Sequence, residues 1–490
     1  MNSRGFGRRP AFIGRKFAHS TRSRGPTFAH REAIYPLDRA AVRAALTSLR
    51  ACNPPTPRLA TAMQALRVPL GVSGVSGGAL RAPRRVVSSA PRGARRVRSR
   101  SSTVLAQAAD PSGVKVVGVG SAGVDYLASI ASFPEPDAKL RTDALEVQGG
   151  GNCGNACTAM ARLGLSPSIL TKLSDDGAGK AILDEFAADG VDTSAVIIEP
   201  GKSSPFTYII VDRAGSTRTC IHTPGPEFHP SELSPAAAAA LVDGAALVYF
   251  DGRLTEVALN VALAAREKGI PVLVEGERTR DNLPELLRMG DYVCTSAGYP
   301  KDYTGEASTE AAMVKLLAEL PRARAMVTTL GKRGAVMLRR VDDWDGEETR
   351  ATLRETLAQL EMASAAAAAV VGGHAGEPEP GTVPVPAPPV ASPTVYLTDC
   401  GDEDAAAVGP VTVTFAPAAK MRAEDVADTT GAGDSFIGSM CYGVATGLDL
   451  KDAMRLGAYV AARKCTKLGA RPGLPARDTV PKDLLEGPAW

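Results

Sequence analysis

A short loop near the carboxyl end of the chain has the residue types needed to bind an anion. Gly431, Ala432 and Gly433 carry almost no side chain, and they precede a segment whose apolar residues recur with helical spacing. At a helix N-terminus, free main-chain N–H groups and the helix dipole favour an anion. Asp434 follows in the first predicted helical turn. Main-chain donors beside one carboxylate suit phosphoryl transfer, because the carboxylate can accept the proton of an attacking hydroxyl.

A second glycine-rich loop, Gly149 to Asn155, precedes another segment with helical periodicity. Its three consecutive glycines would let a ligand approach the main chain closely. Asn152 and Asn155 offer amide groups that can hold hydroxyls from two directions. A plain glycine-rich turn with a helix cap would explain the glycines, but it would not explain two asparagines spaced by three.

A third loop, Gly118 to Gly123, matches the dinucleotide-binding pattern GxGxxG after a predicted strand, with Asp137 or Asp143 near the distance of a ribose-binding acid. That pattern requires a helix to begin inside the loop. The segment that follows contains two prolines and is typical of a second strand. The sequence therefore disfavours an NAD-dependent enzyme.

Short runs typical of buried strands alternate with helical segments from Val114 onward. This alternation predicts an α/β fold with a parallel sheet between helix layers and ligand loops at the carboxyl ends of the strands. Two further strands flank Arg213 to Thr217 and are expected to form a hairpin. Residues 342–409 interrupt the alternation with a polar helix candidate and a stretch rich in Pro and Gly. We interpret that segment as a low-complexity insertion within one domain, a tolerated surface loop.

The first 109 residues differ sharply in charge from the rest. They contain 21 Lys and Arg but only two acidic residues, Glu32 and Asp38, whereas the remainder has 35 basic and 51 acidic residues. A long basic segment rich in Arg, Ser and Ala, with no apolar run of membrane length, predicts a disordered organellar transit peptide. We expect cleavage near Ala106 to Ala109 and a plastid rather than a mitochondrial destination. Met63 is an alternative start, and a nucleic-acid-binding arm is the disfavoured alternative.

The eight cysteines are scattered without a CxxC pair, and the chain has only five histidines. Neither a disulfide framework nor a zinc site is therefore indicated.

The two chemically informative loops together resemble the signatures of the PfkB, or ribokinase-like, sugar kinases. The stretches are "DTTGAGDSF" at Asp428 to Phe436 and "GGGNCGNACTAMARLG" at Gly149 to Gly164, and the resemblance extends from about Val114 to Pro475. The sequence is most similar to the ketohexokinase branch of that family, on the stretches "FDGR", "VEGERTR", "STRTCIH" and "KCTKLGARPG".

The resemblance implies a kinase domain over 110–490. Its fold would be a three-layer α/β sandwich with a mostly parallel central sheet and a small β-sheet lid. It implies Asp434 as the general base and Gly431 to Gly433 as an anion hole. The positions that match sugar-binding residues are Asp125, Gly151, Asn152 and Asn155. Those that match nucleotide-binding residues are Arg218, Gly331, Lys332, Arg333, Gly334 and Thr430.

The implied activity is ATP-dependent phosphorylation of a small sugar, with Mg²⁺ as cofactor and a ketose such as fructose favoured. The family's "NxxE" motif is replaced by "SAGY" at Ser296 to Tyr299. The magnesium ligands therefore stay unassigned, with Glu275 and Glu277 as candidates for contacts through water. Family resemblance also implies a homodimer through the lid sheet, and neither a membrane nor a nucleic-acid partner is expected. The alternatives are a nucleoside or polyol kinase, or a catalytically weak structural component of a plastid transcription complex.

Overall fold

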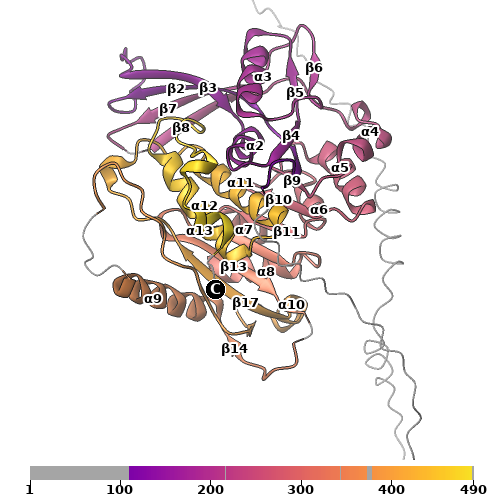
Figure 1. The fold of residues 1–490 in the computed structure, drawn as a ribbon, viewed down its shortest axis with the longest axis vertical. Helices are drawn as coiled ribbons and strands as arrows, with labels where there is room; N and C mark the ends of the chain where they lie inside the picture. The colour runs from indigo at the N-terminus through magenta and orange to yellow at the C-terminus, as the bar shows by residue number, and fades with distance from the viewer. Residues whose placement is uncertain (1–109, 216, 343, 372–377, 488–490) are drawn as a thin grey trace, which may run out of the picture. The chain divides into compact units, whose positions relative to one another are not determined.

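The computed structural model describes residues 110–487 apart from 216, 343 and 372–377 (Figure 1). The predictions for residues 1–109, including the transit peptide, its cleavage near Ala106 to Ala109 and the alternative start at Met63, lie outside the described residues.

The described chain is organised around one large sheet (Figure 1). Its central strands are parallel and lie in the order β4-β1-β9-β10-β11-β12. They are β1 (Lys115–Val119), β4 (Ser166–Leu170), β9 (Leu247–Phe250), β10 (Val272–Gly276), β11 (Tyr292–Thr295) and β12 (Ala325–Thr329). Runs of apolar residues form these strands because both faces of a parallel sheet are covered.

The sheet continues beyond β12 with antiparallel pairs. Here β13 pairs with both β12 and β17, and three short strands complete the edge in the described ranges. These strands are β13 (Gly334–Arg340), β14 (Arg350–Ala351), β15 (Val390–Ala391), β16 (Val395–Leu397) and β17 (Pro410–Pro417).

Two layers of helices cover the sheet, because successive residues of each strand point to opposite faces. In β9, Val248 and Phe250 join one buried cluster, whereas Leu247 and Tyr249 join the other. On the first side lie α4 (Pro235–Leu241), α5 (Thr255–Glu267), α6 (Leu283–Leu287), α7 (Tyr299–Thr304), α8 (Thr309–Ala318), α9 (Leu353–Val371) and α10 (Asp402–Val408). On the second lie α2 (Asn152–Arg162), α3 (Gly177–Asp189), α11 (Ala432–Thr446), α12 (Leu450–Cys465) and α13 (Lys482–Glu486).

A separate four-stranded sheet, here called the lid sheet, has the order β3-β2-β7-β8. It consists of β2 (Gly123–Ile130), β3 (Ala144–Gly150), β7 (Phe206–Asp212) and β8 (Thr217–Thr223). The predicted hairpin is β7 with β8, which pair antiparallel. The GxGxxG stretch leads into β2 rather than into a helix, as expected. A further pair, β5 (Lys172–Ser174) with β6 (Ile197–Glu199), is parallel. The predicted three-layer sandwich with a small lid is confirmed.

Parts of segment 342–409 belong to the core, which the interpretation of this segment as a surface loop did not anticipate. Leu353, Leu357 and Leu360 of α9 are buried, at i, i+4 and i+7, in the same cluster as residues of β17. Three leucines on one side of an otherwise polar and alanine-rich helix give a narrow apolar stripe that composition conceals. The proline-rich residues 378–389 contain neither helix nor strand. None of the helices in the described ranges is long and apolar enough to cross a bilayer.

Candidate active site

The predicted site residues gather at the edge of the sheet where the parallel strands end. Asp251 directly follows β9, Glu277 follows β10 and Ser296 follows β11. Ligands of open α/β sheets bind at this edge. The N-termini of α2 and α11, which carry the two signature loops, contribute side chains to the same place, because Asn155 of α2 contacts Asp434 of α11.

Asp434 lies in the first turn of α11 and is only 9% exposed. Asn155 donates a hydrogen bond from Nδ2 to its Oδ2 at 2.8 Å. Burial raises the pKa of Asp434 to about 6, while the Asn155 hydrogen bond opposes that rise and the nearby carboxylate of Glu277 adds to it. A carboxyl group with such a pKa is ionised at neutral pH and can still accept a proton in a reaction.

Gly431 and Gly433, in the loop before Asp434, differ in whether the structure requires a glycine. Gly431 has a φ of 75°, and a Cβ there would lie 2.7 Å from the Cβ of Ala470. Gly433 has no such constraint, since outside its chain neighbours and the nearby backbone of its own helix no described atom lies within 4 Å of the position of its Cβ. The amide of Ala432 donates to the Thr429 carbonyl at 3.2 Å. The open side of the loop is therefore at Gly433.

Thr430, predicted to bind the nucleotide, has its hydroxyl turned to Asp428. Its amide and its Oγ1 both donate to Asp428 Oδ1, at 2.9 and 2.8 Å. Asp428 Oδ2 accepts from the Gly469 amide at 2.9 Å, and the buried Lys464 ammonium donates to the Asp428 carbonyl at 2.6 Å. Burial lowers the pKa of Lys464. Thr430 therefore supports the conformation of the loop through its hydrogen bonds to Asp428.

Asp125 projects from β2 of the lid sheet and is buried. Burial raises its pKa to about 6, and the guanidinium of Arg471 opposes the rise. A Cβ at Gly150 would lie 2.3 Å from the Asp125 Cγ, so the glycine makes room for this carboxyl group. Gly151, with a φ of 87°, precedes the first residue of α2. Asp125 and the start of α2 are thus adjacent, as the two sugar-binding predictions require.

Asn152 is surrounded by charged groups. Its Oδ1 accepts from Arg253 Nη2 at 3.1 Å, and its Nδ2 lies 3.4 Å from carboxylate oxygens of both Glu275 and Glu277. Arg253 also pairs with Glu277 at 2.8 Å. Burial, reinforced by neighbouring carboxylates, raises the pKa of Glu275 well above its ordinary value, and Tyr249 donates to it at 2.8 Å.

Two charged residues of the stretch "FDGR" were not predicted individually as site residues. Asp251 accepts from the amide and hydroxyl of Ser121, both at 2.7 Å, and Arg253 reaches Asn152. A Cβ at Gly120 would lie 2.2 Å from the Asp251 Cγ. Glycine at position 120 of the GxGxxG stretch therefore leaves room for the Asp251 carboxylate. The position of "FDGR" after a buried strand was the available sequence signal.

Arg218 and the "GKRG" turn, both predicted to contact the nucleotide, differ in what they touch. Arg218 of β8 donates from Nη1 to Thr429 Oγ1 at 2.6 Å, so it joins the lid sheet to the loop before Asp434. Gly331 and Lys332 lie in a single 3₁₀ turn after β12, and Arg333 of the same turn forms an exposed ion pair with Glu361 of α9 at 2.7 Å.

Gly334 ends that turn, and its glycine has a structural explanation. Its φ is 119°, and a Cβ there would lie 2.1 Å from the Ala416 carbonyl oxygen. The turn is at the same sheet edge as the other site residues, but Arg333 pairs with Glu361 of α9, and Gly334 lies opposite Pro417 of β17.

Arg471 is a buried charge in the site that the sequence did not predict. Its guanidinium donates to Asn155 Oδ1 at 3.1 Å, to Glu185 Oε2 at 3.1 Å and to the Gly150 carbonyl at 3.2 Å. It lies within "KCTKLGARPG", but 316 residues separate it from Asn155 in the sequence. Only the folded chain reveals this contact.

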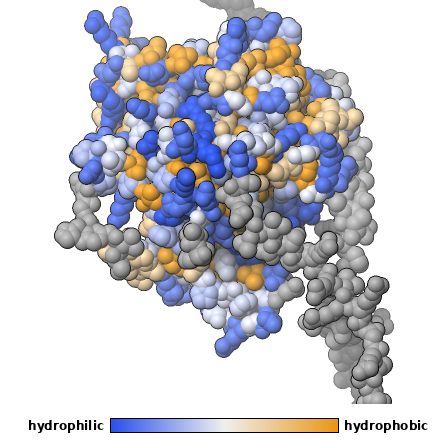
Figure 2. All heavy atoms as spheres, in the orientation of Figure 1, coloured by the Kyte–Doolittle hydropathy of each residue, from blue (hydrophilic) through white to orange (hydrophobic). Residues whose placement is uncertain are grey.

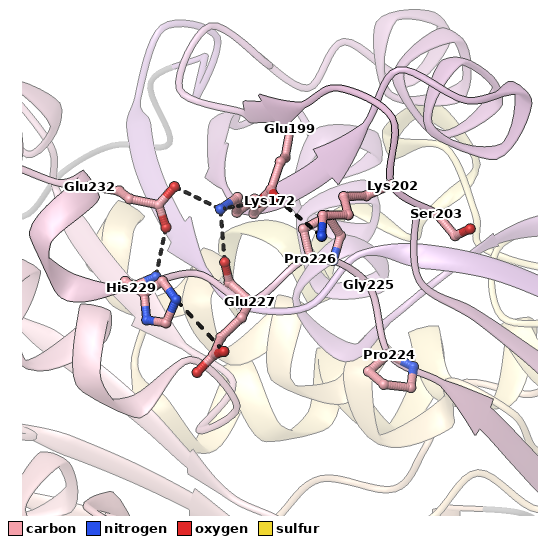
Figure 3. A pocket seen from close by; sticks show the side chains of 10 residues that line it. All are labelled: Lys172, Glu199, Lys202, Ser203, Pro224, Gly225, Pro226, Glu227, His229 and Glu232. Atoms are coloured by element: carbon pink, nitrogen blue, oxygen red, sulfur yellow. Dashed lines mark hydrogen bonds and ion pairs between the residues drawn. The ribbon is translucent and has the colours of Figure 1, made fainter. Parts of the chain in front are cut away.

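A surface pocket elsewhere in the domain holds several charged residues (Figure 3). The ammonium of Lys172 donates to Glu232 at 2.6 Å and to the Glu227 carbonyl at 2.8 Å, and it pairs with Glu199 at 2.7 Å. Its donors are therefore already used, and the pocket offers no unpaired charge of Lys172 to a ligand.

Comparisons with known proteins bear on these observations. The family model described as pfkB family carbohydrate kinase matches residues 114–351 and 391–477. The bifunctional ribokinase/ribose-5-phosphate isomerase A of Fructilactobacillus sanfranciscensis is 23% identical over 227 residues, which cover 45% of this chain and 42% of that protein. Ketohexokinase of Mus musculus is 21% identical over 361 residues, which cover 72% of this chain and 96% of that protein.

Among solved structures, the Arabidopsis thaliana ribokinase complexed with ribose and ATP is similar, with a TM-score of 0.52 and 18% identity. The alignment covers 76% of this chain and 98% of that chain. At this identity the likeness shows the fold alone.

Proposed function

Because the chain belongs to the pfkB family of carbohydrate kinases, we propose that it transfers the γ-phosphoryl group of ATP to a hydroxyl of a small sugar, with a ketose such as fructose favoured. Asp434 is the general base in this proposal, and main-chain amides of Gly431 to Gly433 stabilise the charge on the transferred group. Asp125, Asn152 and Asn155 hold the acceptor, and Arg218 reaches the nucleotide phosphates.

The observation that carries the proposal is the buried Asp434 carboxylate beside the unobstructed Gly433. Glycine in a helix costs about 1 kcal/mol relative to alanine. Neither a positive φ nor any described neighbour requires glycine at 433. A ligand that approaches the main chain at this point supplies the missing reason. The phosphoryl group would then lie next to the only side chain of the loop that can accept a proton.

ATP is proposed as the donor because the family phosphorylates carbohydrates and the Arabidopsis ribokinase was solved with ATP. Mg²⁺ bound with a nucleotide keeps several waters and takes one or two carboxylates besides phosphate oxygens. Within the described residues, no cluster of three or more His, Cys, Asp or Glu side chains is placed to hold a metal. Glu275 and Glu277, which share Asn152, fit this lesser requirement as hard oxygen donors acting through water. Mg²⁺ would neutralise phosphate charge there.

Replacing Asp434 tests the proposal. Asp434→Asn keeps the size of the side chain but removes the base, so turnover should fall by about 10²–10⁴-fold. Binding of ATP should change by less than about tenfold, because main-chain amides are unaffected. The full chain is assayed with ATP against ketoses, aldoses, polyols and nucleosides, and ATP affinity is measured separately by calorimetry.

The panel also separates the alternatives. A nucleoside or polyol as the best acceptor would replace the sugar in the proposal and leave the role of Asp434 intact. Near-full turnover by Asp434→Asn would remove Asp434 from the mechanism. A wild-type chain that binds no ATP, phosphorylates nothing and co-purifies with a large nucleoprotein assembly would favour the structural-component alternative.

We also propose that residues 1–109 direct the chain to an organelle, the plastid ahead of the mitochondrion, because of their basic and acid-poor composition. A fluorescent fusion of these residues should enter the organelle and lose them. An intact fusion that stays in the cytosol would contradict this.

A further inference from the structure

The guanidinium of Arg471 is held in a single position. Arg471 is 3% exposed, and each of its three nitrogens donates to a different acceptor: Asn155, Glu185 and the Gly150 carbonyl. Its Cζ lies 4.8 Å from the ring centroid of Phe186. A planar guanidinium with three fixed acceptors has little freedom to turn. Whatever Arg471 contacts is therefore oriented by it.

Asn155 lies between Arg471 and Asp434. Its Oδ1 accepts from Arg471 Nε at 3.1 Å, and its Nδ2 donates to Asp434 Oδ2 at 2.8 Å. The two ends of a primary amide are similar in shape but opposite in hydrogen-bonding character. The reversed amide would direct an NH₂ group at a guanidinium and an oxygen at a carboxylate. Only the observed orientation satisfies both neighbours, and Arg471 enforces it from one side.

Two glycines of the Gly149 to Asn155 loop make room for this arginine. A Cβ at Gly149 would lie 2.1 Å from Arg471 Nη1, and a Cβ at Gly154 would lie 2.7 Å from Nη2. The Gly149 amide also donates to both carboxylate oxygens of Glu185, at 2.9 and 2.8 Å. The loop is thus shaped around the ion pair of Arg471 with Glu185, as well as around a ligand.

From these contacts we infer that Arg471 is a positioning residue for the reaction, which acts through Asn155 to keep a hydrogen-bond donor on Asp434. The inference rests on the proposed role of Asp434 as general base. Glu185 balances the charge of Arg471. A continuous chain of hydrogen bonds thus runs from α3 to α11, through Glu185, Arg471, Asn155 and Asp434. No direct contact of Arg471 with substrate is required.

Loss of this orientation has a defined electrostatic consequence. The Asn155 hydrogen bond lowers the pKa of Asp434 against the effect of burial. Without it, the pKa rises and less of the base is ionised at neutral pH. Asp251, Arg253, Glu275 and Glu277 also act on Asp434. Lys464 and Tyr249 act on it as well, and all six groups are unchanged in every variant of Arg471 and Asn155. Arg471→Met also removes a positive charge behind Asn155, so Arg471→Lys, which keeps that charge, and the double-mutant cycle below separate this effect from loss of the Asn155 contact.

The kinetic test uses Arg471→Met and Arg471→Lys in the full chain. We expect Arg471→Met to lower kcat by about 10- to 100-fold at pH 7, because the base is misoriented. The acid limb of its kcat profile should move upward by more than about 0.5 pH unit. Arg471→Lys, which keeps the charge but not the fork, should fall between Arg471→Met and the wild type. Arg340→Met is the matched control, since Arg340 also donates to buried carbonyls, those of Leu317 and Val408.

A double-mutant cycle separates a positioning role from a merely structural one. If Arg471 acts through Asn155, adding Arg471→Met to Asn155→Ala should reduce kcat by less than about twofold further. Full multiplication of the two effects would overturn the inference. So would an acid limb that stays in place in Arg471→Met, or one that moves equally in Arg340→Met.

A second readout needs no turnover. The difference in unfolding free energy between a protein and its Asp434→Asn variant, followed against pH, reports the pKa of Asp434. Its midpoint should lie higher in the Arg471→Met background, and an unchanged midpoint would contradict the inference. If no acceptor is found for the wild type, the proposed function fails while this measurement still decides the positioning role. If Arg471→Met does not fold, Arg471→Lys carries both readouts.

Discussion

Asp434 and Asp125 are buried carboxyl groups, each with a pKa raised by burial to about 6. A general base works in its ionised form, so turnover should be half-maximal near pH 6, level off above about pH 7, and fall by about tenfold for each pH unit below about pH 5. We expect kcat, measured at saturating substrates, to follow Asp434. In Asp125→Asn the same limb should persist in kcat, while the KM of the acceptor rises. A kcat that stays flat down to pH 4.5 would contradict the assignment.

The same shift has a consequence for stability, with a definite sign. Because the pKa of Asp434 is higher in the folded chain than its ordinary value of 3.8, the charged form is disfavoured by folding. The stabilising contribution of the protonated form is complete below pH 3.8 and is lost as the pH rises through 6. Asp434→Asn should therefore be more stable than the wild type at pH 7, by about 1–3 kcal/mol. Equal or lower stability in chemical denaturation would argue against a raised pKa.

Gly431 and Gly433, which precede Asp434, give a matched pair of variants. Gly433→Ala meets no described neighbour and improves helix propensity, so stability should rise or stay unchanged, by up to about 1 kcal/mol. If the phosphoryl group approaches this amide, kcat/KM should nevertheless fall by at least about tenfold. Gly431 has a positive φ, and a Cβ at this position would contact Ala470. Gly431→Ala should therefore lose about 1–3 kcal/mol of stability. A Gly433→Ala enzyme that keeps the kcat/KM of the wild type would show that no ligand approaches the main chain at Gly433.

Helices α2 and α11 were predictable from sequence because their loops are local signatures. Gly149 to Asn155 and Gly431 to Asp434 each occupy a few consecutive residues, and the alternating strand and helix pattern fixes where they meet. Arg471 and Lys464 were not predictable as partners of these loops. Arg471 contacts Asn155 across 316 residues, and no periodicity in the sequence encodes such a pairing.

For helix α9 the sequence-based interpretation was wrong, because the composition of the helix concealed its part in the core. Its polar and alanine-rich sequence indicated a surface segment, yet Leu357 is buried beside β17. Leu357→Ala should therefore lower the free energy of unfolding by about 2–5 kcal/mol. Met362, on the same helix, is 65% exposed, and Met362→Ala should change it by less than about 0.5 kcal/mol. Equal, small effects in chemical denaturation would restore the interpretation of α9 as part of a tolerated surface loop.

At the scale of the whole molecule, the site depends on segments from both ends of the domain. Asn155 and Asp434 are 279 residues apart in sequence, and the lid sheet reaches the same place through Arg218 and Thr429. The proposed site therefore draws residues from both the large sheet and the lid sheet.

The outer face of the lid sheet is apolar and exposed. Val147, Tyr126, Tyr208 and Ile221 are aligned across its four strands, so their side chains share one face. Val147, Tyr208 and Ile221 are exposed, and Leu145 is exposed beside them. In Figure 2 apolar side chains gather over the region of these strands. Asp125 and Arg218 lie on the opposite face, because their positions in the strands alternate with those of the apolar set.

We propose that a second copy of the chain covers this apolar face, since exposed patches of this kind mark interaction sites. A two-fold interface places each residue twice, so one substitution introduces two charges into it. Tyr208→Lys and Ile221→Lys should therefore convert a dimer into a folded monomer, as measured by light scattering and sedimentation. Met362→Lys, at an exposed apolar position on α9, should leave the dimer intact. Because the same strands carry Asp125, the monomer should also bind the acceptor more weakly, with a higher KM and an unchanged ATP affinity. A monomeric wild type at micromolar concentration, or dimeric lysine variants, would show that the face has another role.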